Sequence, residues 1–123
     1  MTVLLVLLGG AIGAPMRYLT DLFVQSRHDT VFPWGTLTVN VTGSLLLGGL
    51  ASAVSNAGAP AWLLTLVGTG FCGALTTFST FGFETVRLVE DGSWVEALLN
   101  VTASTVMGLS AVAVGWLVVD LLW

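Results

Sequence analysis

Polar side chains recur at a helical spacing inside long apolar stretches of this sequence. Thr36, Asn40 and Ser44 follow one another at intervals of four residues, so on a helix they form one stripe of hydroxyl and amide groups. Such a stripe can join helices through hydrogen bonds, or it can line a pore with groups that replace the hydration shell of an ion. Both functions can hold at once where helices pack together.

A second stripe has the same spacing nearer the C-terminus. Asn100, Ser104 and Gly108 are again four residues apart, whereas Thr102 and Thr105 lie off this stripe. The same two interpretations apply to it. We therefore expect one polar face on each of two helices.

Two phenylalanines could add an aromatic element to such a path. Phe78 and Phe81 are three residues apart, so they lie on one face of a helix. The edge of an aromatic ring is electropositive, and edges turned towards a path would attract an anion, although packing is the commoner role of a lone pair of rings. Glu84 and Arg87 continue the same spacing, and they can pair with each other near the membrane surface.

Arg17 is the charged side chain placed furthest into an apolar stretch. An arginine at the centre of a bilayer costs about 2.5–3.5 kcal/mol on insertion scales. Asp21 lies four residues later on the same face, so a pair that reaches the interface is slightly favoured. The alternative is a cation held at the mouth of an anion path.

The segment over residues 68–82 is rich in glycine and threonine, which are poor formers of a continuous helix. The apolar stretch around it, residues 61–89, is also longer than a bilayer requires. Both features predict a helix that is broken near Gly73–Thr77. Backbone carbonyls freed by such a break are tolerated inside a membrane where they line a cavity, and there they can hold a cation.

The composition requires lipid around these groups. The chain has 123 residues, of which 55% are hydrophobic and 8% charged, and its mean hydropathy is +0.96. A soluble domain carries about 25% charged residues. The sequence therefore predicts an all-α membrane protein with one domain, residues 1–123. Its four transmembrane helices are expected over 2–24, 34–55, 61–89 and 94–122, and the first is expected to be a retained helix because no basic segment precedes it.

The remaining side chains exclude several classes of function. Seven acidic residues against three basic ones give a net charge of −4, so the chain has no basic patch for nucleic acid. Cys72 is the single cysteine, which excludes an internal disulfide, and its apolar neighbours predict a buried, inert thiol. His28 has no second histidine or cysteine nearby. No nucleophile–base pair is present, and we expect no enzyme activity.

The orientation in the membrane is only weakly specified. An even number of spans puts both termini and the loop after Asn56 on one side, which has no lysine or arginine. The other side has Arg27 and Arg87. This bias is small under the positive-inside rule. A single orientation with both arginines in the cytoplasm and insertion in both orientations are equally expected from charge.

Three strings resemble the CrcB/Fluc fluoride channels, and the resemblance covers essentially the whole chain. They are GAIGAPMRY over residues 10–18, GTLTVNVTGS over 35–44 and GFCGALTTFSTF over 70–81, of which the third is the most specific. The resemblance implies a fluoride-selective channel that passively exports fluoride. It also implies an antiparallel, dual-topology dimer with two pathways, in the plasma membrane of a prokaryote. The weak bias of Arg27 and Arg87 allows the second subunit to be a copy of this chain or a sister chain of opposite charge bias.

The resemblance also implies roles for individual residues. Phe78 and Phe81 match the phenylalanines whose ring edges face the ion, and Asn40 matches the pore asparagine. The other matches are a hydroxyl track, Thr36 and Ser104; a cation near the wide vestibule, Arg17; a carboxylate close to the path, Glu84; and carbonyls for a central sodium ion, Gly73 and Thr76. Asn100 and Gly108 stand where some members carry tyrosine and serine, so the resemblance assigns them no role.

Two rival functions remain. A small multidrug-type cation/proton antiporter is also a four-helix antiparallel dimer, but it needs a carboxylate at the membrane centre on its first helix, where this chain has only Asp21 near the helix end. A purely structural assembly protein would leave the broken helix and the pair Phe78 and Phe81 unexplained. A fluoride channel is the preferred hypothesis.

Overall fold

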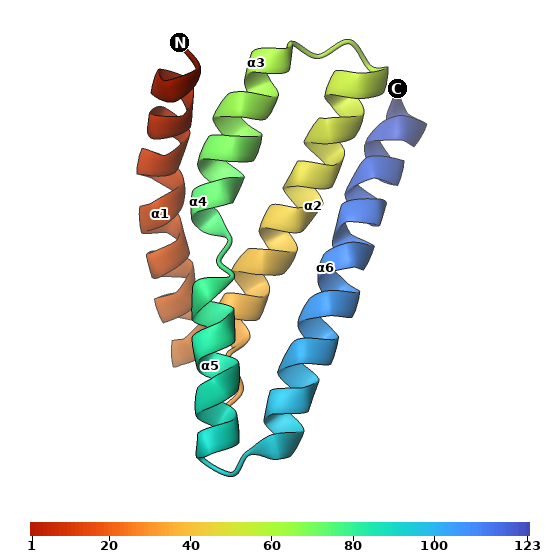
Figure 1. Cartoon of the computed structure of the whole chain (residues 1–123). Helices are drawn as coiled ribbons and strands as arrows, with labels where there is room; N and C mark the ends of the chain where they lie inside the picture. Colours follow the sequence, from red (N-terminus) through yellow and green to blue (C-terminus); the bar gives the residue numbers. More distant parts are fainter.

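The computed structural model describes all 123 residues, and every regular element is helical (Figure 1). The elements are α1 (Thr2–Ser26), α2 (Trp34–Asn56), α3 (Ala61–Leu63), the π-helix η1 (Leu64–Cys72), α4 (Gly73–Leu75), α5 (Ser79–Glu90) and α6 (Trp94–Leu122). The elements α3, η1 and α4 follow one another without a gap. Together with α5 they form the third long helical segment.

Four helical segments are long and apolar enough to cross a membrane, as predicted. They have 25, 23, 30 and 29 residues, where about 20 suffice. Their ends agree with the predicted ranges to within two residues. The largest difference is at α1, which continues to Ser26 because the side chain of Gln25 donates to the Phe32 carbonyl and accepts from the Gly35 amide. These bonds hold the last turn of α1 against the start of α2.

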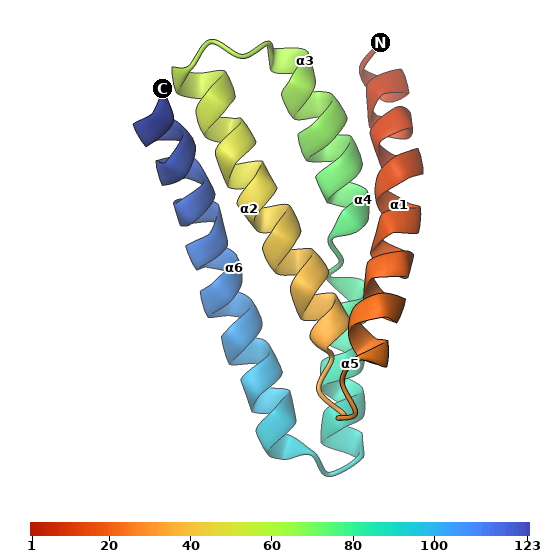
Figure 2. The ribbon, with the colours of Figure 1, turned by 180° about the vertical axis from the view of Figure 1, so that it is seen from behind.

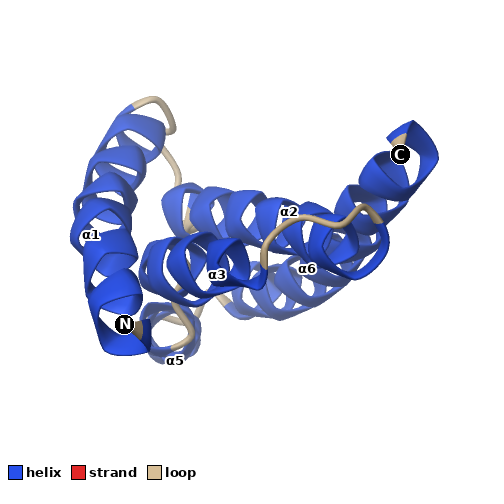
Figure 3. Cartoon of the chain, turned by 90° about the horizontal axis from the view of Figure 1, so that it is seen from above, coloured by secondary structure: helices blue, strands red, loops and turns tan.

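The segments run up and down, with both termini and the loop between α2 and α3 at one end (Figures 1 and 2). The helices nevertheless form an open row and not a closed bundle. Viewed from above, α1 and α6 stand on opposite sides of α2 and the third segment (Figure 3). The most extensive contacts join α2 to α6 and α1 to η1.

This open arrangement leaves most of the apolar surface uncovered. Only 20 of the 123 residues are buried, while large apolar side chains are exposed along every long helical segment. A soluble protein could not keep such a surface in water. Lipid, or another protein in the membrane, must cover it.

Glycines let the helices approach closely where they do pack. A Cβ atom at Gly48 would overlap the Val112 carbonyl, and one at Gly115 would overlap the Leu45 carbonyl and lie 2.9 Å from the Gly49 amide. Small residues are typical of helix contacts in membranes because backbones can then pack directly on one another. The glycines therefore fix the pairing of α2 and α6.

The π-helical stretch was not predicted from the sequence. Residues 64–72 make the wider turn, and Gly70 in this stretch would place a Cβ 2.9 Å from the Val6 carbonyl and 3.1 Å from the Gly9 Cα. The backbones of α1 and η1 thus touch at glycines.

We expect Gly115→Ala to destabilise the chain by roughly 1–3 kcal/mol, because the added methyl group cannot fit against α2 without moving a backbone. Gly108→Ala is the matched control on the same helix, since its Cβ would meet only the Ser44 hydroxyl at 3.9 Å. Thermal unfolding in detergent micelles measures both. Equal unfolding temperatures would contradict the packing described here.

Candidate functional site

The third helical segment is interrupted between α4 and α5, within the predicted range. Leu75 ends α4, Thr76 is extended (φ −79°, ψ 159°), and α5 begins at Ser79. The prediction of a broken third helix is confirmed. Because the break lies midway along the segment (Figure 1), its free backbone groups need partners from within the protein.

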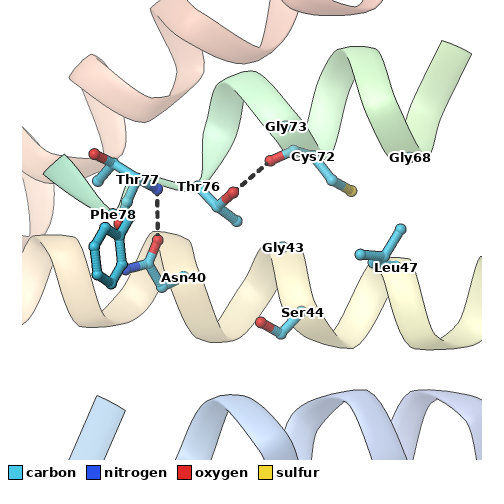
Figure 4. Close-up of a pocket in the computed structure, with 10 residues that line it drawn as sticks. All are labelled: Asn40, Gly43, Ser44, Leu47, Gly68, Cys72, Gly73, Thr76, Thr77 and Phe78. Carbon is cyan, nitrogen blue, oxygen red and sulfur yellow. Dashed lines mark hydrogen bonds between the residues drawn. The ribbon is translucent and has the colours of Figure 1, made fainter. Parts of the chain in front are cut away.

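Asn40 of α2 supplies those partners. Its Nδ2 donates to the Thr77 carbonyl at 2.9 Å, and its Oδ1 accepts from the Thr77 amide at 2.7 Å. Figure 4 shows this side chain facing the break, with the Phe78 ring beside it. An asparagine is suited to this task because its amide carries a donor and an acceptor on one planar group.

Threonines at the break satisfy the neighbouring helix ends. The Thr76 amide and hydroxyl both donate to the Cys72 carbonyl at 2.9 Å, which completes the last turn of α4. The Thr77 hydroxyl accepts from the Thr80 amide at 3.2 Å, which caps the first turn of α5. Threonine, expected only as a poor helix former, here stabilises both sides of the break.

The carbonyl of Gly73 loses its usual helical partner. In a continuous helix the Thr77 amide would donate to it, but that amide donates to Asn40. Gly73 is exposed on the chain surface, and the Thr76 carbonyl lies at the same break. These are neutral oxygen donors of the kind that hard cations prefer. Both predicted carbonyls thus have the chemistry that a sodium ion prefers, and the Thr76 carbonyl also accepts from Arg17.

Arg17 lies beside the break. Its Nη1 donates to the Thr76 carbonyl at 3.5 Å. Asp21, the partner that the spacing favoured, is not its hydrogen-bond partner. The side chain turns towards the broken segment because that carbonyl lies within its reach.

Phe78 and Phe81 lie close together on the α5 side of the break. Their ring centroids are 5.9 Å apart and their planes are tilted by 43°. Phe78 is 83% exposed in the single chain, whereas Phe81 is half-buried. Lipid, or another protein in the membrane, must cover the exposed face of the Phe78 ring.

A cavity of about 200 Å³ lies between α2, the break and α6. It brings together four predicted site residues, Asn40, Phe78, Phe81 and Ser104, and it is also lined by Ser44, Thr77, Thr105 and Gly108. A second cavity of about 330 Å³ begins at the same Asn40 and Phe78 and reaches Gly68 between α2 and the third segment (Figure 4). None of the residues that line either cavity is charged.

The second polar stripe differs from its prediction. Thr105, which lies off that stripe, lines the cavity, whereas Asn100, which lies on it, is fully buried and does not. The side chain of Asn100 instead donates to the Thr85 hydroxyl at 2.8 Å. The spacing of residues along one helix could not predict this difference between Asn100 and Thr105, because it does not show that α5 covers one end of the stripe.

Thr36, Glu84 and Arg17 lie outside the cavity that contains the two phenylalanines. The buried Thr36 hydroxyl donates to the Glu84 carboxylate, so it joins α2 to α5. Glu84 therefore has Thr36 as its hydrogen-bond partner, and not the Arg87 that the spacing suggested. Thr36 and Arg17 line a separate cavity of about 240 Å³ that includes Tyr18, Asp21 and Thr80.

The comparison with known proteins matches this chain over most of its length. The model of the family described as CrcB-like protein, Camphor Resistance (CrcB), matches residues 4–116. A protein of Frankia casuarinae named fluoride-specific ion channel FluC 1 is 54% identical, over 98% of this chain and 97% of the relative.

Two further relatives carry the same name. The protein of Streptomyces avermitilis is 52% identical over 98% of this chain and 97% of its own length, and that of Thermobifida fusca is 45% identical over 94% and 98%. The broken third segment and the three sequence strings all lie within the matched region. This chain therefore belongs to the CrcB-like family, as the resemblance in its sequence predicted.

Proposed function

We propose that this chain is the subunit of a fluoride-selective channel in the cell membrane. The observation that carries the proposal is the cavity at the break, where the Asn40 amide, the two phenylalanine rings and the Ser104 hydroxyl converge. Family membership and the names of the relatives support fluoride as the ion. The channel is not an enzyme.

The chemistry of the cavity suits a small anion. Fluoride is strongly hydrated, so a pathway must replace its water with hydrogen-bond donors. The hydroxyl groups of Ser44 and Thr105 can donate hydrogen bonds to the ion, and the edges of the phenylalanine rings add positive potential. The absence of a charged side chain from this lining favours release, because conduction requires binding that is weak enough for the ion to leave.

Transport is proposed to be passive. A membrane potential that is negative inside drives an anion outward, by about 2.3 kcal/mol per charge for each 100 mV. The channel would then lower cytoplasmic fluoride without an energy source of its own. Arg17 and Glu84, which lie outside the central cavity, are proposed to act at the wider approach to the pathway.

A second, inverted copy of the chain is proposed to complete the channel. The exposed Phe78 ring and the open row of helices support this, since both leave surface that an antiparallel copy could cover. The absence of lysine and arginine from one end, against Arg27 and Arg87 at the other, is a small bias that permits insertion in both orientations.

A structural sodium ion is proposed at the dimer centre. The Gly73 and Thr76 carbonyls would hold it, with two carbonyls from each chain. When bound, the ion would supply a fixed positive charge near the break. The residues of this chain keep the carbonyls in place through the bonds between Asn40 and Thr77.

The antiporter alternative has little support in this structure. Its coupling carboxylate would be Asp21, the single acidic residue of α1, and this residue lies beside Gly35 at the end of the helix. A carboxylate near the membrane surface cannot carry a proton across the membrane centre.

Purified protein in liposomes is expected to release trapped fluoride, measured with a fluoride electrode, while trapped chloride stays inside. Asn40→Asp is expected to stop this release, because the carboxylate repels fluoride and cannot donate to the Thr77 carbonyl as the Asn40 amide does. Size-exclusion chromatography checks the assembly of both proteins. Absence of fluoride release from folded wild-type protein would overturn the proposed function, and unchanged release by Asn40→Asp would remove this residue from the pathway.

The inverted dimer predicts that both ends of the chain face both sides of the membrane. In the variant Asp29→Cys, whose new thiol lies in the exposed loop after α1, a membrane-impermeant maleimide added to intact cells is expected to label about half of the copies, because the orientation bias is small. Wild-type protein is the control, since its Cys72 is buried. Labelling of all copies or of none would instead mean a single orientation.

A further inference from the structure

Asn100 is a fully buried polar side chain that the proposed pathway does not use. It is 0% exposed, and it does not line the cavity that contains Ser104 and Phe81. A buried amide is expected to be hydrogen-bonded, because leaving one unsatisfied costs more than a typical hydrogen bond contributes. The partners of Asn100 therefore indicate what it does.

Its partners form a chain of hydrogen bonds that leads to the pathway. The Asn100 Nδ2 donates to the Thr85 hydroxyl at 2.8 Å, and that hydroxyl donates to the Phe81 carbonyl at 2.8 Å. On the other side, the Ser104 hydroxyl donates to the Asn100 Oδ1 at 3.4 Å. Asn100 thus connects two residues that line the cavity, although it lies behind both.

The helix that carries Phe81 has few other attachments within the chain. Since the break separates α5 from α4, its main contact is with α6, along the lower half of that helix (Figure 1). Two adjacent residues of α5, Glu84 and Thr85, attach this helix to two other helices. Glu84 accepts from Thr36 of α2, and Thr85 accepts from Asn100 of α6.

These two bonds fix the rotation of α5 about its own axis. Residues 84 and 85 are about 100° apart on a helix, so bonds at both positions oppose rotation in either direction. Rotation of α5 would swing the Phe81 ring out of the cavity. The bond from Asn100 is the one that joins α5 to the helix that also bears Ser104.

We infer that Asn100 is a positioning residue: it holds α5 against α6 through Thr85, and thereby keeps Phe81 and Ser104 at the pathway without contacting the ion. This inference rests on the proposed function of a fluoride channel. The spacing of Asn100 along α6 could not decide between helix packing and pore lining. The inference assigns Asn100 to packing.

The test compares Asn100→Leu, Thr85→Val and the double variant in the liposome assay. Each single change is expected to slow fluoride release about tenfold, on the order of the loss of one buried hydrogen bond. The double variant is expected to be no slower than Asn100→Leu alone, because both changes remove the same bond. Thr85→Ser keeps the hydroxyl and is expected to release fluoride at the wild-type rate.

Hydrogen–deuterium exchange of the amides in α5 gives a second readout that does not depend on fluoride. Exchange is expected to rise in Asn100→Leu and Thr85→Val, and to stay at the wild-type level in Thr85→Ser. If Asn100→Leu does not form dimers, the comparison of Thr85→Val with Thr85→Ser carries the test.

Two results would overturn the inference. One is a wild-type rate of fluoride release in Thr85→Val. The other is slowing in the double variant that equals the product of the two single effects, as expected if Asn100 donates to the ion directly. If the wild-type protein releases no fluoride, the proposed channel function is refuted. Hydrogen–deuterium exchange of α5 would still decide whether Asn100 holds this helix in place.

Discussion

The pair of hydrogen bonds between the Asn40 side chain and the Thr77 backbone is the interaction on which the rest of the structure depends. A helix that stops inside a membrane exposes peptide groups that water cannot reach, and each unsatisfied group is costly there. Asn40 satisfies an amide and a carbonyl at once. The break can therefore exist in the middle of the span. Its consequences are a free Gly73 carbonyl on one side and a helix, α5, that begins anew on the other.

The separate start of α5 explains why the site has both aromatic and polar character. Because α5 is not a continuation of α4, the rings of Phe78 and Phe81 can lie next to Asn40 and opposite Ser104. The helix then needs its own attachments, which Thr36 and Asn100 supply from two sides. The glycine contacts of α2 with α6 bring Asn40 and Ser104 onto facing helices. Neutral groups thus surround a cavity in an otherwise apolar protein.

Much of this could be predicted from the sequence. Apolar length alone gave the four spans, and the glycines and threonines around Gly73 gave the break, because both depend on local properties of the chain. Partners across helices could not be predicted in this way. The spacing paired Arg17 with Asp21 and Glu84 with Arg87, but the structure pairs them with Thr76 and Thr36. It also gave Asn100 and Ser104 the same role, but Asn100 is buried and Thr105 lines the cavity beside Ser104. Such partners depend on how separate helices pack, and a single sequence does not record that packing.

The central claim is that the neutral site at the break conducts fluoride and rejects chloride. The most direct measurement is the reversal potential of the purified protein in a planar bilayer, with fluoride on one side and an equal concentration of chloride on the other. Selective conduction predicts a steady current carried by fluoride, with a reversal potential far from zero in the direction set by the fluoride gradient. A reversal potential near zero would mean that both anions pass equally well, and it would contradict the account.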